Sequence, residues 1–134
     1  MLKGINHITI AVSDLDRAIN FYQQQLTMQL QVRWTNGAYL TVGELWLCLS
    51  VDIVKPSKDY SHIAFDIDEQ DFVSFSERLL ASGIDVWKQN NSEGCSLYLL
   101  DPDGNKLEIH AGNLASRIAK MKENLTDGMI FYDQ

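Results

Sequence analysis

Hydrophobic residues along the chain switch between strand-like and helical spacing in a regular order. A β-branched run over residues 5–12 predicts a buried strand, and apolar residues at helical spacing predict an amphipathic helix over 15–26. Turn sequences that contain glycine then separate three further strand-like runs. These runs cover residues 30–33, 38–42 and 45–50.

The same order of elements returns in the second part of the chain. A strand-like run over 60–67 is followed by a helical pattern over 69–82. Three shorter strand-like runs come after it, at 86–88, 96–100 and 106–110. The pattern therefore predicts an internal βαβββ repeat.

Turn and cap residues support these boundaries. Ser13 and Asp16 resemble the capping box that starts a helix, and Asp68 stands where a cap is expected for the second helix. Gly83 predicts the end of that second helix. Residues 101–104 form the sequence Asp-Pro-Asp-Gly, which predicts a tight turn because Pro presets φ and Gly accepts a positive φ.

The sequence thus predicts one α+β domain over residues 1–134, built from tandem βαβββ repeats. Asn113 is expected to cap a short last helix that ends near Glu123. The expected parts are a first half (1–51), a polar linker that contains proline (52–59), a second half (60–112) and a C-terminal helix and tail (113–134).

The repeat places a histidine at the same point in both halves. His7 and His62 each stand in the first strand-like run of their half. Side chains alternate along a strand, so both imidazoles point into any concavity that these strand faces line. Glu108 lies between two apolar residues in the last strand-like run, and Cys48 stands at the corresponding position of the first half.

Two histidines and one carboxylate suit Mn²⁺, Fe²⁺ or Zn²⁺ and leave coordination positions open for a substrate. Open positions are typical of a catalytic metal site. His7, His62 and Glu108 are therefore candidate metal ligands. We interpret Cys48 as a small buried apolar residue, and His110 as a structural or supporting group beside the ligands.

Composition and charge narrow the function classes. Apolar residues make up 46% of the 134 residues and charged residues 22%, as in an ordinary globular chain. The net charge of −7 disfavours nucleic-acid binding, and the apolar runs are too short to span a membrane. Residues 1–13 carry no pattern of a secretory signal, and the only two cysteines are Cys48 and Cys95. We therefore expect a cytoplasmic protein without a disulfide.

Many short motifs, in order, resemble the glutathione-dependent fosfomycin-resistance transferases. That family lies within the vicinal-oxygen-chelate superfamily, which also includes glyoxalase I and the extradiol dioxygenases. The resemblance covers nearly the whole chain and implies a cupped mixed sheet in a domain-swapped homodimer. The motifs are Asn6-His7 with Thr9, residues 37–40, residues 45–50, Asp59-Tyr60 with His62, residues 87–90, residues 92–94, Tyr98, residues 101–104, Leu107-Glu108 and the helix that carries Arg117.

The resemblance implies a role for each matching residue. His7, His62 and Glu108 resemble the Mn²⁺ ligands, with His7 supplied across the subunit interface. Thr9 and Tyr39 resemble catalytic residues, and Tyr39 resembles the group that helps to ionise the glutathione thiol. The residues that resemble the binding site for the phosphonate and epoxide of the drug are Thr9, Lys88, Ser92, Tyr98 and Arg117, with Trp46 packed beside them. Ser92, Gly94 and Ser96 resemble a K⁺-binding loop.

The chemistry of the drug agrees with these roles. A dianionic phosphonate needs charge-assisted donors such as Lys88 and Arg117, and an acidic protein must supply them as a local cluster. The nucleophile is the thiolate of glutathione, because a neutral thiol attacks poorly. One position departs from the family, which commonly has Arg where this chain has Asn91. Glutathione binding is therefore expected to be weaker or differently arranged.

Other functions stay open at this point. A related enzyme can use water or another thiol as its nucleophile, although no added carboxylate suited to a hydrolase is evident. A drug-sequestering protein of the same fold usually lacks the metal triad. Glyoxalase I needs a fourth ligand where Cys48 stands, and dioxygenases normally have longer chains. The expected function is a metal-dependent transfer of glutathione to the epoxide of fosfomycin.

Overall fold

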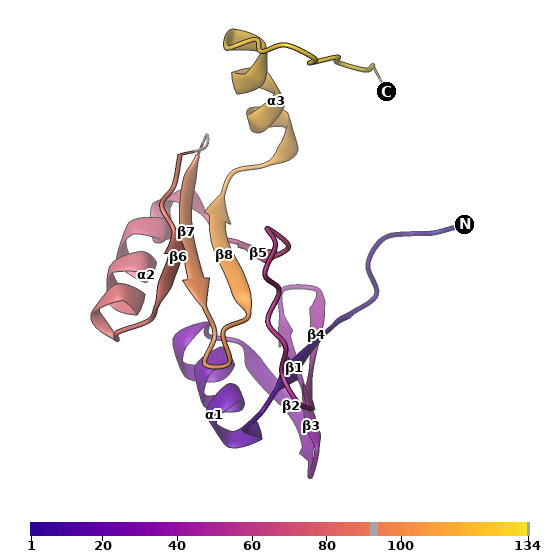
Figure 1. The fold of residues 1–134 in the computed structure, drawn as a ribbon, viewed down its shortest axis with the longest axis vertical. Coiled ribbons are helices and arrows are strands. Elements are labelled where there is room, and N and C mark those ends of the chain that lie inside the picture. Colours follow the sequence, from indigo (N-terminus) through magenta and orange to yellow (C-terminus); the bar gives the residue numbers. More distant parts are fainter. Residues whose placement is uncertain (92–93, 134) are drawn as a thin grey trace.

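The computed structural model describes every residue except 92, 93 and 134. Two βαβββ halves follow one another along the chain, and each half has its own four-stranded sheet (Figure 1). A C-terminal helix projects beyond the two sheets, and the N-terminal arm extends away from them (Figure 1). This arrangement confirms the expected α+β class with a tandem βαβββ repeat.

The first half forms a sheet with the strand order β1-β4-β3-β2. β1 runs parallel to β4, whereas the other neighbours are antiparallel. Helix α1 leads directly into a short π-helix, η1. The elements are β1 (Ile8–Val12), α1 (Leu15–Asn20), η1 (Phe21–Gln25), β2 (Gln29–Trp34), β3 (Gly37–Val42) and β4 (Leu45–Val51).

The second half repeats this topology with the strand order β5-β8-β7-β6. β5 is parallel to β8, as β1 is to β4. The elements are β5 (Ile63–Asp66), α2 (Glu69–Ala81), β6 (Val86–Lys88), β7 (Cys95–Leu100), β8 (Lys106–Ala111) and the C-terminal helix α3 (Leu114–Glu123). In the part of the chain that the structure describes, no helix is long and apolar enough to cross a membrane.

The repeat extends to strand register. Cys48 lies opposite Thr9 in the parallel pair of the first sheet, and Glu108 lies opposite Ala64 in that of the second. Thr9 and Ala64 are each the second residue of their strand. The predicted equivalence of Cys48 and Glu108 is therefore confirmed.

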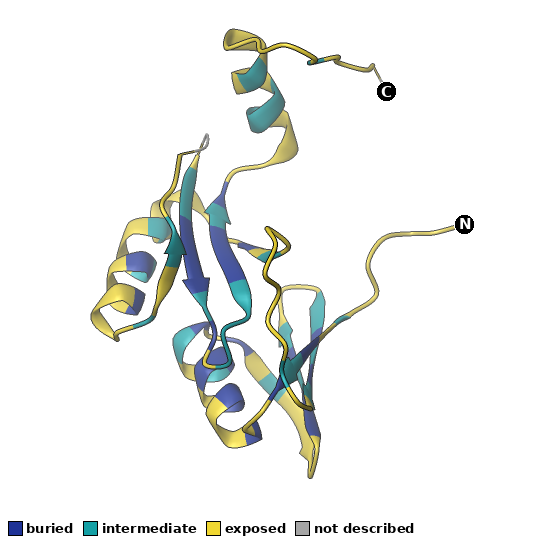
Figure 2. Ribbon diagram, in the orientation of Figure 1, coloured by how far each residue is buried: buried dark blue, intermediate teal, exposed yellow. Residues whose placement is uncertain are grey.

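Strand alternation divides each sheet into an apolar and a polar face. Leu47 and Leu49 on β4, and Leu107 and Ile109 on β8, are buried in one hydrophobic core that spans both halves. Leu79 of α2 belongs to the same core. In Figure 2 the buried residues lie mainly in the strands and in α1, whereas α3 and the N-terminal arm are exposed or intermediate.

Both first strands begin later than their hydrophobic patterns predicted. β1 begins at Ile8 and β5 at Ile63, instead of at residues 5 and 60. In the first half, residues 1–7 are exposed in the N-terminal arm, where the apolar Ile5 has no sheet to pack against. His7 and His62 consequently stand one residue ahead of their strands.

A side-chain turn delays the start of β5. The carboxylate of Asp59 accepts hydrogen bonds from the backbone N–H of Ser61 at 2.9 Å and from the hydroxyl of Ser57 at 2.5 Å. These bonds, that of Ser57 most strongly, lower the pKa of Asp59 to about 2. The turn uses an N–H group that a strand ladder would need, so the ladder begins only at Ile63.

The residues that cap the helices differ from the prediction for α1 and agree with it for α2 and α3. Asp14, and not Ser13 or Asp16, caps α1, because its side chain accepts the backbone N–H of Arg17 at 3.0 Å. Asp68 occupies the cap position of α2, although its side chain makes no capping bond. Asn113 caps α3 as predicted and forms a capping box with Ser116.

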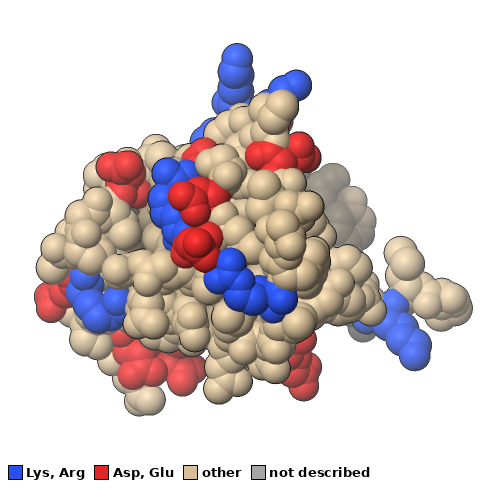
Figure 3. All heavy atoms as spheres, turned by 90° about the horizontal axis from the view of Figure 1, so that it is seen from below, with Lys and Arg blue, Asp and Glu red and all other residues tan. Residues whose placement is uncertain are grey.

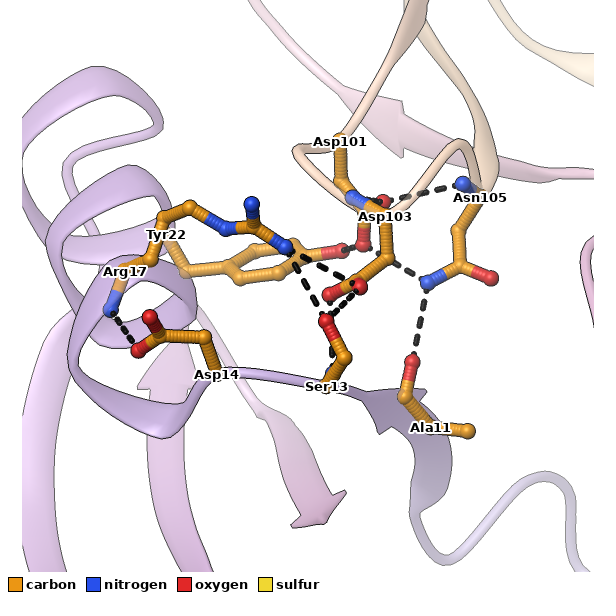
Figure 4. Close-up of polar contacts among 8 residues, drawn as sticks. All are labelled: Ala11, Ser13, Asp14, Arg17, Tyr22, Asp101, Asp103 and Asn105. Atoms are coloured by element: carbon orange, nitrogen blue, oxygen red, sulfur yellow. Dashed lines mark hydrogen bonds and ion pairs between the residues drawn. The ribbon is translucent and has the colours of Figure 1, made fainter. Parts of the chain in front are cut away.

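The two halves are held together by a buried carboxylate in the turn between β7 and β8. Asp101 is only 4% exposed. It accepts hydrogen bonds from the hydroxyl of Tyr22 at 2.8 Å and from the side-chain amide of Asn105 at 2.8 Å (Figure 4). The backbone N–H groups of Asp103 and Asn105 also donate to it, both at 2.9 Å. A buried charge with this many donors is fully compensated.

Neighbouring residues of the same turn extend this connection, which we call the Asp101 clasp. Asp103 accepts from the backbone N–H and hydroxyl of Ser13 and forms a 3.1 Å ion pair with Arg17 (Figure 4). Asn105 donates to the carbonyl of Ala11 at 3.0 Å. Burial, and then the charge of Asp101, raise the pKa of Tyr22. The clasp therefore joins the second half to both β1 and α1.

We expect Asp101→Ala to lower the free energy of unfolding by more than about 3 kcal/mol, because it leaves several buried donors without an acceptor. Tyr22→Phe removes one donor and should cost about 2 kcal/mol. The matched control is Asp16→Ala, which removes an exposed carboxylate 2.8 Å from Arg33 and should cost less than about 1 kcal/mol. Urea unfolding at a fixed protein concentration measures all three. Equal small losses would show that the clasp does not hold the halves together.

Candidate metal centre and active site

The second sheet carries a cluster of polar and aromatic side chains on the face opposite α2, which we call the second polar face. Glu108 and His110 alternate with the core residues of β8. Across the ladder, Tyr98 lies opposite Glu108 and Ser96 lies opposite His110. Lys88 on β6 lies opposite Tyr98, and His62 stands just ahead of β5.

The geometry of His62 and Glu108 is compatible with a cation held by both side chains. Nδ1 of His62 lies 2.7 Å from the carbonyl oxygen of Tyr60, which can only accept, so Nδ1 carries the proton. Nε2 of His62 is 2.9 Å from Oε1 of Glu108. If the imidazole is neutral, the lone pair of Nε2 faces the lone pairs of Oε1, and the two atoms repel each other. A proton or a metal ion bound by both atoms removes this repulsion. The pair therefore fits a metal such as Mn²⁺ or Zn²⁺, which binds imidazole nitrogen and carboxylate oxygen.

The other oxygen of Glu108 is held by the protein. The hydroxyl of Ser96 lies 2.6 Å from Oε2 of Glu108 and 2.6 Å from Nδ1 of His110. His110 Nδ1 is itself 3.4 Å from Oε2. Glu108 is only 6% exposed, so its charge is buried among these partners. Such a carboxylate is stable only when it is hydrogen-bonded or bound to a metal.

A second cation, Lys88, lies beside this pair. Its Nζ is 4.5 Å from the centre of the Tyr60 ring and 4.7 Å from that of Tyr98, and it donates a hydrogen bond to the Tyr60 hydroxyl. This bond raises the pKa of Lys88 and lowers the pKa of Tyr60. Lys88 therefore keeps its positive charge. The ring of Trp87 packs close by, with its centre 5.2 Å from that of the Tyr98 ring.

The first sheet carries its own row of candidate residues, the first polar face. The ring of Trp46 lies 4.3 Å from that of His7 and 5.1 Å from that of Tyr39. Thr9 and Tyr39 both lie opposite Cys48 in the ladders that flank β4. Among the residues that the structure describes, the buried Nε1 of Trp46 has no hydrogen-bond partner. A buried donor without an acceptor is uncommon in a folded protein, so this N–H is an unusual feature of the first polar face.

The predicted site residues thus fall into two groups. His62, Lys88, Ser96, Tyr98 and Glu108 lie on the second polar face. His7, Thr9, Tyr39 and Trp46 lie on the first. Outside residues 92, 93 and 134, no three potential metal ligands come together within one chain. Residues of both faces, Thr9 and His62, line a pocket of about 310 Å³.

Among the remaining predicted residues, Gly94 directly precedes β7. Gly94 has a φ of +83°, and its carbonyl accepts a hydrogen bond from the side chain of Asn90 at 3.0 Å. Arg117 is on α3, away from the sheet ladder. Ser92 lies outside the described residues, so the K⁺-binding loop stays a prediction.

Sequence analysis assigned no site role to Tyr60 and only a supporting one to His110. Tyr60 uses its carbonyl to orient His62 and its hydroxyl to hold Lys88. Its place two residues ahead of a candidate ligand was the available signal. For His110 the signal was its position two residues after Glu108, on the same strand face.

Fold and site together define a class of protein. The chain belongs to the Glyoxalase/Bleomycin resistance protein/Dioxygenase superfamily, whose sequence pattern matches residues 4–109. Relatives within this class are more specific. The chain is 50% identical to the glutathione transferase FosA of Serratia marcescens, over 98% of this chain and 96% of that protein. It is 37% identical to the metallothiol transferase FosB of Shouchella clausii, over 100% of this chain and 97% of that protein.

Solved structures agree with these relatives. A crystal structure of the fosfomycin resistance protein FosX from Listeria monocytogenes matches with a TM-score of 0.81 at 28% identity, covering 90% of this chain and 99% of that one. Another structure of FosX, in complex with Mn(II) and a sulfate ion, matches with a TM-score of 0.80 at 28% identity. It covers 90% of this chain and 98% of that one.

We expect Glu108→Ala to weaken Mn²⁺ binding by more than about 100-fold, since the loss of a direct ligand should exceed the 10–100-fold effect of a supporting residue. Cys48→Ala is the matched control, because Cys48 occupies the equivalent register position and should not bind the metal. Titration of metal-free protein, followed by Mn²⁺ electron paramagnetic resonance, measures both affinities. Full affinity in Glu108→Ala would remove this residue from the metal site, and a loss in Cys48→Ala would make Cys48 a fourth ligand.

Proposed function

We propose that the protein is a metal-dependent glutathione transferase that inactivates fosfomycin by opening its epoxide. The observation that carries this proposal is 50% identity to a glutathione transferase, FosA, over nearly the whole of both chains. The His62–Glu108 pair, with charged Lys88 beside it, gives the chain the ligands and the cation that this reaction needs. The FosB and FosX relatives support the same antibiotic chemistry.

The proposed metal ligands are His62 and Glu108 of one copy and His7 of a second copy. Support for Mn²⁺ comes from these donors and from the Mn(II) complex of FosX. When bound, the metal supplies a Lewis acid that polarises the epoxide oxygen. The protein holds the imidazole of His62 in the required tautomer through the carbonyl of Tyr60.

The separation of the two polar faces supports the proposal of a domain-swapped homodimer. β1 and β5 each form an edge of their sheet, and an open edge can pair with another chain. Large apolar side chains are also exposed on the projecting ends: Ile5 is 79% exposed, Leu114 74% and Tyr132 77%. Contact with a second copy would cover these residues and bring its first polar face to the second polar face of this chain.

Residues from both faces are proposed to hold the phosphonate. Lys88 supplies a fixed positive charge, and Tyr98, Thr9 and Arg117 complete the donor set. Trp46 is proposed to pack beside the drug. On the surface that Figure 3 shows, Lys and Arg side chains are interspersed with Asp and Glu, so that surface is not a basic face. The attraction for the phosphonate is therefore proposed to come from the local cations of the site. Ser92, with Gly94 and Ser96, is proposed to bind K⁺.

In the proposed reaction the thiolate sulfur of glutathione forms a bond to an epoxide carbon while the carbon–oxygen bond breaks. The released alkoxide takes a proton from solvent, and the product is a glutathione adduct. Tyr39 on the first polar face is proposed to hydrogen-bond the thiol and favour its ionised form. Asn91 offers an amide where the family commonly has a cation, so glutathione binding should be weaker. We place the reaction in the cytoplasm, where glutathione keeps both cysteines reduced.

The reaction can be tested by incubating the purified protein with fosfomycin, glutathione, Mn²⁺ and K⁺. Mass spectrometry should detect the adduct, and a chelated control should not form it. A hydrated product would instead indicate epoxide hydrolysis, and an adduct formed only with cysteine or bacillithiol would indicate another thiol. Drug binding without either product would contradict catalysis and favour sequestration.

Lys88→Ala should weaken fosfomycin binding to the Mn²⁺-loaded protein by about 10–100-fold, the value of one charge-assisted hydrogen bond. Lys55→Ala, in the exposed linker, is the charge-matched control and should bind normally. Isothermal titration calorimetry measures both. Unchanged affinity in Lys88→Ala would exclude this residue from the anion site.

A further inference from the structure

His110 is half-buried in a cradle made by two glycines. A Cβ atom at Gly94 would lie 2.9 Å from Cε1 of His110, and one at Gly112 would lie 2.8 Å from Nε2. Both glycines have a positive φ, +83° and +151°, which side chains rarely adopt. The backbone around the β7 and β8 ends thus leaves room for one imidazole ring, and packing fixes the orientation of that ring.

The fixed ring points into the hydrogen bonds of Glu108. Ser96 has a single hydroxyl proton and lies 2.6 Å from both His110 Nδ1 and Glu108 Oε2. An ionised carboxylate only accepts, so the hydroxyl proton goes to Glu108. Nδ1 of His110 must then donate to the serine oxygen. The hydrogen bonds run in one direction, from His110 through Ser96 to Oε2.

We infer that His110 is a positioning residue, which acts through Ser96 to hold Glu108 in the orientation that binds the metal. With Oε2 engaged in this way, Oε1 is the oxygen that faces His62, at 2.9 Å. Without the His110 donor, the Ser96 hydroxyl is free to rotate and the buried carboxylate can turn. The role of His110 rests on the proposed function, since it requires Glu108 to be a metal ligand.

The effect should appear as metal affinity, independently of catalysis. Groups that orient a metal ligand typically contribute 10–100-fold to metal affinity, so losing the His110 donor should weaken Mn²⁺ binding by about that factor. His110→Phe keeps a ring in the glycine cradle but removes the N–H. His110→Asn returns an N–H donor near the position of Nδ1, so it should recover most of the affinity.

The experiment titrates Mn²⁺ into metal-free protein by electron paramagnetic resonance, with Tm recorded for each variant. His110→Phe and Ser96→Ala should each lose about 10–100-fold in Mn²⁺ affinity. Because both changes break the same chain of hydrogen bonds, the double variant should bind Mn²⁺ no more weakly than the weaker-binding of the two single variants. If His110→Phe does not fold, Ser96→Ala alone must show the loss. Additive losses in the double variant, or no recovery in His110→Asn, would overturn the relay.

Glu108→Ala in the same titration separates the two levels of the argument. If Glu108→Ala loses Mn²⁺ while His110→Phe and Ser96→Ala bind normally, the positioning role is wrong and the metal site stands. If Glu108→Ala also binds normally, the proposed metal site itself is wrong, and the role of His110 is wrong with it.

Discussion

The buried carboxylate of Asp101 is the constraint on which the arrangement of the two halves depends. It lies in the second half but accepts the hydroxyl of Tyr22 from the first, and the neighbouring Asp103 binds Ser13 and Arg17. A buried charge is costly unless every lone pair finds a donor, so the turn and the first half stay in one relative orientation. In that orientation His7 lies against Trp46, and the described residues of one chain contain no cluster of three potential metal ligands.

This separation gives a physical reason for an assembly of two copies. Each face alone holds only part of the proposed site: the second polar face has two of the proposed ligands and a cation, and the first has the third proposed ligand and a tyrosine. The open edges of β1 and β5 and the exposed apolar ends are on the parts of the chain that a second copy would cover. The proposed site between two chains thus depends on the orientation that the clasp fixes within each chain.

Local patterns in the sequence predicted most of the fold and the positions of several candidate site residues. The βαβββ repeat and the equivalence of Cys48 with Glu108 follow from short-range alternation, which the structure preserves. Contacts that join distant segments were beyond such patterns. Ser13 does not cap α1 because its partner is Asp103, far along the chain, and β5 starts late because the Asp59 turn competes for backbone groups. The cradle of His110 likewise needs two strand ends to meet.

The most direct test of this account is a heterodimer with His7→Ala in one copy and Glu108→Ala in the other. If the metal site combines His7 of one copy with His62 and Glu108 of its partner, this heterodimer keeps one intact site. It should therefore bind about half as much Mn²⁺ as the wild-type dimer, whereas neither variant homodimer binds it tightly. No recovery of Mn²⁺ binding in a heterodimer shown to be correctly assembled would contradict the shared site.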